Sequence, residues 1–361
     1  MTLNYSTKAL FTGSAWLNDV VVHIENELVV GIDQKEFDAN NAKPLIIPAL
    51  IDLQLYGAGG KLLSEFPEKE TIEKIYRFCI EGGAGFFQPT IASQSKDIIY
   101  ASIDAVKAYK AAGGKGCIGL HLEGPWIHPS KKGAHDVSVI HVPNMEEVES
   151  ILAYGKGLIS MITLAPEMCT PAIIKTIQDA GIVVSAGHTN ATYETAMQFF
   201  DAGIPVATHL FNAMSSFQHR APGVVGALFN HPTAMSSIIA DGHHVDYAAI
   251  RVAKKIMGDR LFCITDAVTE TSTGLYQHTL VGDKYESAGT LSGSALTQLK
   301  SIQNLVEHVG IPLGEAIRMC SLYPAKVMQN NNITGTIAIH KKANLLCLAA
   351  DFTILNSVFN H

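Results

Sequence analysis

The chain has 361 residues, of which 47% are hydrophobic and 16% are charged, and its formal net charge is −7 at pH 7. This composition provides enough apolar surface for a packed core and is not that of a disordered chain. The acidic balance offers no source for the counterion release that drives nucleic-acid binding, so we expect no nucleic-acid partner.

Both ends of the chain have β-type patterns without helical segments between them. Four short stretches are rich in β-forming residues: 16–24, 28–32, 335–339 and 344–348. We therefore predict a small β-sandwich domain built from both chain ends, residues 1–48 and 333–361. Residues 49–332 are assigned to one larger domain.

Within the larger domain, eight short apolar runs end in polar or chemically active residues, and most are followed by a segment with helical character. The runs end near Gln54, Thr90, Glu123, Ala165, His188, His209, Asp241 and Asp266. Successive ends lie from about 21 to about 42 residues apart, which accommodates one strand, one helix and two loops. This pattern predicts an α/β fold, an eight-stranded βα barrel of the TIM type.

Several elements between these runs can be bounded. Residues 69–81 and 97–112 place apolar side chains three and four residues apart, which predicts two amphipathic helices. Asn190-Ala-Thr-Tyr-Glu places a capping residue at the start of a third helix. Residues 274–293 predict a hairpin insertion with a tight turn at Gly282-Asp283.

The cysteines and the N-terminus bear on the compartment. The six cysteines stand singly, with no C-x-x-C pair, which is typical of a reduced protein. The N-terminus lacks the charged start and apolar core of a secretory signal. No apolar stretch approaches the roughly 18 residues that a membrane helix needs. We expect a cytoplasmic protein with no membrane partner.

The strand ends carry the residues of greatest chemical interest. In a βα barrel the C-terminal ends of the strands meet at one mouth, so polar residues there lie close together. Glu123, His188 and His209 are suitable ligands for a divalent ion and leave a position for water. Asp266 would then lie beside that water. Each residue also has a structural alternative, such as a hydrogen-bonded strand-end histidine, or Asp266 as a helix N-cap.

Longer motifs surround these residues in a fixed order. They are His121-Leu-Glu-Gly-Pro-Trp126, Lys132-Gly-Ala-His135, Leu164-Ala-Pro-Glu167, Ser185-Ala-Gly-His-Thr-Asn-Ala191, Thr208-His-Leu-Phe-Asn-Ala-Met214, Ile239-Ala-Asp-Gly-His-His-Val-Asp246, Thr265-Asp-Ala267 and Thr290-Leu-Ser-Gly-Ser294. Between about residues 47 and 325 the chain thereby resembles the N-acetylglucosamine-6-phosphate deacetylases, a branch of the amidohydrolase superfamily.

This resemblance implies a role for each site residue. It places the metal ligands at Glu123, His188 and His209 and the catalytic carboxylate at Asp266. His135 matches a histidine that helps to polarise the acetyl carbonyl and contacts the sugar. The remaining implied substrate contacts are Asn212, Ala213 and Leu291, with Arg220 and His244 as the cationic contacts to the phosphate.

The chain departs from the superfamily pattern at the first barrel strand. Many members have His-x-His there and bind a second metal, whereas this chain has Gln54-Leu-Tyr56. An amide and a phenol are poor ligands for such an ion. We therefore predict one divalent metal per subunit and regard Gln54 and Tyr56 as vestigial second-metal positions, with the hydrogen-bonding role of Tyr56 open. Zinc is the favoured ion, with iron, manganese and cobalt as alternatives.

The reaction implied is metal-dependent hydrolysis of N-acetylglucosamine 6-phosphate to glucosamine 6-phosphate and acetate. A metal-bound water would attack the acetyl carbonyl, with Asp266 as general base and then general acid. The resemblance also implies a homodimer. Three alternatives stay open: the galacto epimer of the substrate, a barrel amidohydrolase acting on a cyclic amide or a base, and a sugar-phosphate sensor without catalysis.

Overall fold

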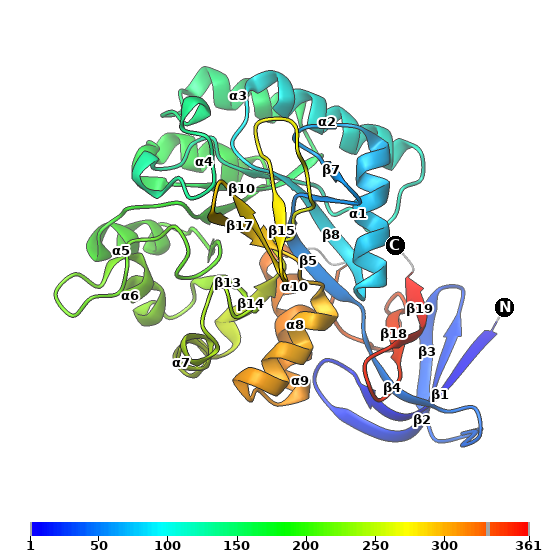
Figure 1. Ribbon diagram of the computed structural model, residues 1–361. Helices are drawn as coiled ribbons and strands as arrows, with labels where there is room; N and C mark the ends of the chain where they lie inside the picture. Colours follow the sequence, from blue (N-terminus) through cyan, green and yellow to red (C-terminus); the bar gives the residue numbers. More distant parts are fainter. Residues whose placement is uncertain (1, 330–332, 360–361) are drawn as a thin grey trace.

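A computed structural model describes residues 2–329 and 333–359 of the chain, and an eight-stranded parallel sheet forms its centre (Figure 1). The strands, in spatial order, are β5 (Leu50–Leu55), β8 (Ala84–Ile91), β9 (Leu120–Glu123), β10 (Ile159–Leu164), β11 (Val183–Ala186), β12 (Val206–Ala207), β13 (Met235–Ile239) and β14 (Leu261–Ile264). A parallel bridge between Leu55 and Ala267 joins the last strand to the first. The predicted βα barrel is confirmed.

The barrel strands are apolar because both of their faces are covered. All six residues of β5 and all eight of β8 are buried. Parallel strands in this position need side chains that pack on the inside of the barrel and against helices on the outside, so their sequences are continuous apolar runs. This explains why each of the eight predicted runs coincides with a barrel strand.

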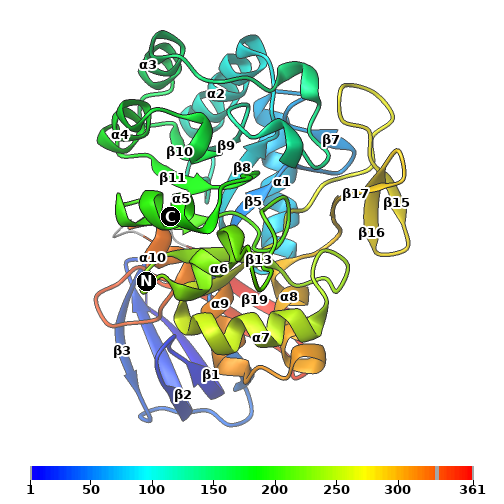
Figure 2. The ribbon, with the colours of Figure 1, turned by 90° about the vertical axis from the view of Figure 1, so that its left-hand side faces the viewer.

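Helices surround the barrel (Figure 2). They are α1 (Lys69–Glu81), α2 (Lys96–Ala111), α3 (Met145–Tyr154), α4 (Pro171–Asp179), α5 (Tyr193–Asp201), α6 (Gly223–Asn230), α7 (Tyr247–Met257), α8 (Gln298–Asn304), α9 (Leu313–Cys320) and α10 (Leu322–Met328). Shorter helical turns lie at Pro129–Lys131, Val137–Val139, Pro166–Met168, Gly258–Arg260 and Leu305–Val309. Among the described residues, no helix is both long and apolar enough to cross a membrane.

The helix predictions agree closely with these bounds. The pattern over residues 69–81 corresponds to α1, and the pattern over 97–112 is shifted by one residue from α2. The capping residue of α5 is Thr192, whose side chain accepts a hydrogen bond from the backbone of Thr195. Asn190 lies two residues earlier, where its backbone N–H donates to a carboxylate oxygen of Glu167 (2.7 Å).

Strands from both chain ends form a second sheet of six strands, which Figure 1 shows beside the barrel in blue and red. In spatial order they are β19 (Ile354–Phe359), β18 (Asn344–Leu348), β4 (Lys43–Pro48), β1 (Thr2–Phe11), β2 (Trp16–Glu25) and β3 (Leu28–Asp33). The predicted small β domain built from both ends is thus confirmed. Its limits, residues 1–48 and 333–361, stay a prediction.

Two details of this sheet differ from the sequence prediction. Residues 335–339 do not form a strand, although Ile337 is buried and its backbone N–H donates to Thr12 (2.9 Å). Their apolar character reflects a packed loop over the sheet. The apolar run of residues 45–53 is divided at Ala49, because β4 pairs within the terminal sheet whereas β5 enters the barrel.

The insertion after β14 is a three-stranded sheet, and it lies away from the terminal sheet in Figure 2. Its strands are β15 (Thr279–Val281), β16 (Lys284–Ser287) and β17 (Thr290–Ser294). The predicted turn at Gly282-Asp283 joins β15 to β16, and Gly282 has φ +66°, a conformation that favours glycine. A bridge between Ala267 and Ser294 attaches β17 to the end of the barrel. A further two-stranded sheet pairs β6 (Gly57–Ala58) with β7 (Lys61–Leu62).

Candidate active site

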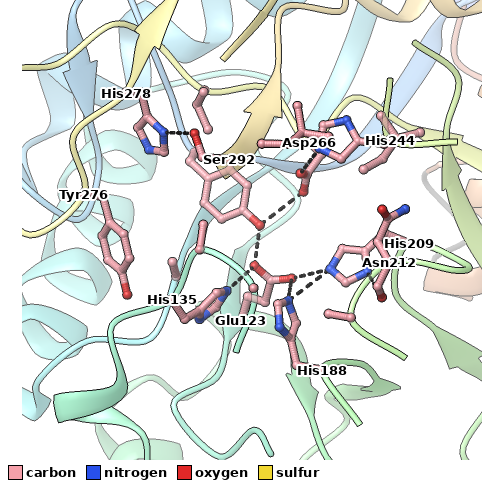
Figure 3. Close-up of a pocket in the computed structure, with 18 of the residues that line it drawn as sticks. Glu123, His135, His188, His209, Asn212, His244, Asp266, Tyr276, His278 and Ser292 are labelled. Carbon is pink, nitrogen blue, oxygen red and sulfur yellow. Dashed lines mark hydrogen bonds and ion pairs between the residues drawn. The ribbon is translucent and has the colours of Figure 1, made fainter. Parts of the chain in front are cut away.

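A cavity of about 200 Å³ opens at the C-terminal ends of the barrel strands. Figure 3 shows the side chains that converge on it. The four residues predicted from the strand ends all line the cavity: Glu123, His188, His209 and Asp266. Glu123 ends β9, and the other three follow β11, β12 and β14. His135, from the loop after β9, lines it as well.

Glu123, His188 and His209 bring three ligand-type atoms together in the interior of the cavity. Glu123 Oε1 lies 3.0 Å from His209 Nε2 and 3.2 Å from His188 Nε2. The two Nε2 atoms are 3.2 Å apart. All three residues are buried. Buried polar and charged atoms are costly unless each has a partner. The close approach of these three atoms therefore depends on where the histidine hydrogens lie.

The partners of the two histidines show where these hydrogens lie. His188 Nδ1 is 2.8 Å from the carbonyl oxygen of Lys131, and His209 Nδ1 is 3.1 Å from that of Asn212. A carbonyl oxygen can only accept, so each Nδ1 carries a hydrogen, and in the neutral form of either ring Nε2 has a lone pair that points toward Glu123. With both rings neutral, three lone pairs thus face one another.

Lone pairs in contact repel one another unless a proton or a metal cation lies among them. Tetrahedral ligands about 2.0–2.1 Å from a zinc ion are about 3.4 Å apart, close to the spacing of these three atoms. The geometry therefore fits a divalent cation held by one carboxylate and two imidazoles, with room for a further ligand from the cavity.

His135 directs an N–H, and not a lone pair, toward Glu123. Its Nδ1 accepts from the backbone N–H of Ser93 (3.2 Å) and lies 2.7 Å from the Ser93 hydroxyl. The hydrogen of the neutral ring is therefore on Nε2, which lies 3.2 Å from Glu123 Oε2 and donates to it. Burial lowers the pKa of His135 to about 4, which keeps the ring neutral. By distance alone, Glu123, His135 and His188 could also hold a metal, but His135 offers an N–H.

Asp266 has one oxygen held and the other directed to the cavity. Its Oδ1 accepts from Gln54 Nε2 (2.8 Å) and lies 3.2 Å from the Tyr56 hydroxyl. Its Oδ2 lies 3.9 Å from His244 Nε2. Burial, and then the negative charge of Glu123, raise the pKa of Asp266. A carboxylate with one anchored oxygen, one free oxygen and a raised pKa is suited to proton transfer.

The alternative reading of Asp266 as a helix N-cap is wrong. No helix follows β14 directly, since the chain continues into β15, and the next helix in the chain is capped by Thr297. Asp266 instead has φ +55°, and both His188 (+48°) and His209 (+41°) share this left-handed conformation. Non-glycine residues adopt it at a cost of about 1–3 kcal/mol, and such strain clusters at functional sites.

Tyr56 and Gln54 lie between the two carboxylates. The Tyr56 hydroxyl donates to Glu123 Oε2, and Gln54 Nε2 donates to Glu123 Oε1 (3.0 Å) as well as to Asp266. Neither side chain offers the paired imidazoles of a second metal site.

The expected substrate contacts divide into two groups. Asn212, Ala213, His244 and Leu291 line the cavity. Arg220 does not line it: this exposed residue belongs to a neighbouring hollow that Lys131 also lines.

His244 is held in place by a carboxylate. Its Nδ1 is 2.6 Å from Asp241 Oδ2, and the backbone N–H of His244 donates to Asp241 Oδ1 (2.8 Å). Burial opposes the ionised form of Asp241, but the hydrogen bonds from His244 outweigh it and hold the pKa of Asp241 below its ordinary value. An ionised Asp241 keeps a hydrogen on Nδ1 and leaves Nε2 of His244 facing the cavity.

Several lining residues were not anticipated from the sequence, and three of them come from the insertion after β14: Tyr276, His278 and Ser292. The Tyr276 hydroxyl donates to the carbonyl oxygen of Ser93 (2.6 Å), and His278 Nδ1 lies 2.8 Å from the Ser292 hydroxyl. The available signal was the position of the insertion, because loops that follow barrel strands at this end carry function.

Beneath the ligands, a chain of buried hydrogen bonds crosses the barrel interior. His121 Nδ1 lies 3.0 Å from the carbonyl oxygen of Leu53 and so carries the ring hydrogen. His121 Nε2 must then accept from Thr163 (2.8 Å), Thr163 from Thr208 (2.7 Å) and Thr208 from Ser185 (2.6 Å). The donor and the acceptor of each of these three hydrogen bonds are thereby determined.

Replacing Thr208 by valine is expected to lower the free energy of unfolding by about 1–3 kcal/mol, because the Ser185 hydroxyl then loses its acceptor in the interior. Urea unfolding measures the change. The exposed Thr290→Val is the matched control, with an expected effect within about 0.5 kcal/mol. Equal effects at both positions would contradict the directed chain.

Comparisons with known proteins identify the family of the chain. Residues 45–360 match the amidohydrolase family. The chain is 34% identical to the N-acetylglucosamine-6-phosphate deacetylase of Haemophilus influenzae, over 92% of this chain and 89% of that protein. It is 29% identical to the N-acetylgalactosamine-6-phosphate deacetylase of Escherichia coli O157:H7, over 96% of this chain and 95% of that protein.

A solved structure extends the similarity to the whole fold. The crystal structure of N-acetylglucosamine-6-phosphate deacetylase from Pasteurella multocida aligns with a TM-score of 0.93 and 32% sequence identity. The alignment covers 99% of this chain and 98% of that one, so both the barrel and the terminal sheet are included.

Proposed function

Because the chain belongs to the amidohydrolase family, and within it to the N-acetylglucosamine-6-phosphate deacetylases, we propose that it hydrolyses the acetamide of N-acetylglucosamine 6-phosphate to glucosamine 6-phosphate and acetate. The protein is an amide hydrolase of a metal-dependent family. The observation that carries the proposal is the convergence of Glu123 Oε1, His188 Nε2 and His209 Nε2 in a cavity that Asp266 also lines.

We assign Glu123, His188 and His209 as ligands of one divalent ion per subunit. A mixed set of one oxygen and two nitrogens suits zinc, and iron, manganese or cobalt are the alternatives. When bound, such an ion polarises a carbonyl oxygen and lowers the pKa of water.

His135 and Asp266 would divide the remaining chemistry between them. His135 is neutral and carries its hydrogen on Nε2, so it can donate to the acetyl oxygen as negative charge develops there. Asp266 Oδ2 would take a proton from the attacking water and return it to the nitrogen as the C–N bond breaks. The raised pKa of Asp266 suits both steps.

The phosphate end of the substrate would lie toward His244, Asn212 and Ala213, which line the cavity. Arg220 is exposed and lines the neighbouring hollow. If the protein is a homodimer, as we propose, Arg220 is available to reach a phosphate bound in the partner subunit. A planar guanidinium suits a dianionic phosphate.

A substrate panel tests the proposal. We expect acetate release from N-acetylglucosamine 6-phosphate, with kcat/KM lower by at least about 100-fold for N-acetylglucosamine, because charge-assisted hydrogen bonds contribute about 1.5–3 kcal/mol each. The galacto epimer is the second candidate substrate, supported by the similarity to an N-acetylgalactosamine-6-phosphate deacetylase. Equal rates with and without the phosphate would contradict the proposed substrate class.

A further inference from the structure

Gln54 and Tyr56 lie at and just beyond the end of β5, and both contact the carboxylates of Glu123 and Asp266. Neither residue has a role in the chemistry proposed above. Their contacts, however, involve two of the residues on which that chemistry depends.

The Tyr56 hydroxyl has one hydrogen, and Glu123 Oε2 receives it. The phenol oxygen also lies 2.7 Å from Gln54 Nε2, and because an amide nitrogen cannot accept a hydrogen bond, the phenol hydrogen points away from the amide. Since that hydrogen is used by Glu123, the contact of the phenol oxygen with Asp266 Oδ1 (3.2 Å) is secondary.

The Gln54 amide spans the gap between the two carboxylates. Its nitrogen has two hydrogens and lies within hydrogen-bond distance of Glu123 Oε1 (3.0 Å) and Asp266 Oδ1 (2.8 Å), besides Tyr56. Two buried negative groups repel each other strongly at low dielectric. The neutral donors of Gln54 and Tyr56 offset this repulsion on the side of the carboxylates that faces β5.

These contacts determine which oxygen of Glu123 is available. Oε2 receives the Tyr56 hydroxyl and the Nε2–H of His135 (3.2 Å), which together use its two lone pairs. Only Oε1 then faces the lone pairs of His188 and His209. Glu123 is therefore prepared to bind an ion through a single oxygen. The phenol oxygen also lies between Glu123 and Asp266, where an ion bridging both carboxylates would have to sit.

We propose that Tyr56 is a positioning residue that limits the site to one ion. Its hydroxyl holds Glu123 with one oxygen toward that ion, and Tyr56 together with Gln54 fills the space of a second ion with neutral donors. The inference rests on the proposed metal site at Glu123, His188 and His209. It extends the prediction of one metal by naming the contact that enforces it.

Removing the hydroxyl tests the positioning role. In Tyr56→Phe, the affinity for zinc is expected to fall by about 10–100-fold, as is usual when a hydrogen-bond partner of a metal ligand is lost. Competition with a chromophoric chelator measures the affinity, and the visible spectrum of the cobalt-substituted protein reports the altered geometry. Tyr323→Phe is the matched control, because Tyr323 is buried and donates to Glu315 (2.8 Å), outside the cavity.

Elemental analysis of the metal-saturated protein tests the limit of one ion. The wild type is expected to bind one zinc ion per chain, and the double variant Gln54→His/Tyr56→His is expected to bind two. Thermal unfolding of the metal-free variants identifies any loss of folding. For a folded double variant, a count that stays at one would overturn the inference.

Further outcomes separate this inference from the proposed function. Unchanged zinc affinity in Tyr56→Phe, with one ion in the wild type, overturns only the role of Tyr56. Ionisation of the phenol on metal addition, seen by ultraviolet difference absorption, would make Tyr56 a ligand and also overturn it. A wild-type protein that binds no ion overturns the metal site itself.

Discussion

Replacing Asp266 by asparagine is expected to lower kcat by about 10³-fold or more while the metal content stays near that of the wild type. An amide cannot take a proton from water or return one to the leaving nitrogen, and general acid–base groups contribute about 10²–10⁴-fold to rates. The bound ion is retained because Asp266 lies outside the group formed by Glu123, His188 and His209. Steady-state acetate release, with elemental analysis of the same sample, measures both quantities.

Asp259→Asn is the matched control, since Asp259 is an exposed carboxylate whose partner is Lys326 (3.2 Å). It is expected to leave kcat unchanged. Near-normal kcat in Asp266→Asn would sink the assignment of Asp266 as the proton-transferring group. Loss of the metal from that variant would instead place Asp266 among the ligands.

Removing the divalent ion is expected to abolish turnover, and adding zinc should restore it. Glu123→Gln should have the same effect at limiting zinc, because a neutral amide contributes no charge to a site whose other two ligands are neutral imidazoles. The measurements are activity after dialysis against a chelator, reactivation by stoichiometric zinc, and the zinc affinity of Glu123→Gln.

Glu147→Gln is the control, because Glu147 lies in α3 and its partner is the exposed His141 (2.8 Å). Full activity of a demonstrably metal-free, folded protein would contradict the metal-dependent mechanism. Circular dichroism of the metal-free protein verifies that folding is retained, as expected for a site at the mouth of an extensive core.

Much of the fold could be predicted because parallel barrel strands have to be apolar on both faces. The runs ending near Glu123, His188 and His209 coincide with β9, β11 and β12 for this reason. The strand prediction was wrong at two places in the chain. Residues 335–339 are apolar yet form a loop, and the run of residues 45–53 serves two sheets on either side of Ala49.

The candidate site could be predicted only in part. Strand-end position and motif resemblance selected Asp266, but they could not place Tyr276 and His278 at the cavity. These two residues reach it because Ser294, at the end of β17, is paired beside Ala267, a contact between segments distant in the chain. Nor did the sequence distinguish Arg220, which lies in a neighbouring hollow, from His244, which lines the cavity.

The sequence by itself determined the barrel, the small β domain and the residue types at the mouth, since these follow from local apolar patterns and from the meeting of strand ends. Only the tertiary structure decided what each histidine presents to the cavity. His188 turns a lone pair inward because it donates to the carbonyl of Lys131, 57 residues earlier, whereas His135 turns an N–H inward because Ser93, 42 residues earlier, occupies its other nitrogen. Which ring nitrogen of a histidine carries the hydrogen is set by a hydrogen-bond partner that lies far away in the sequence.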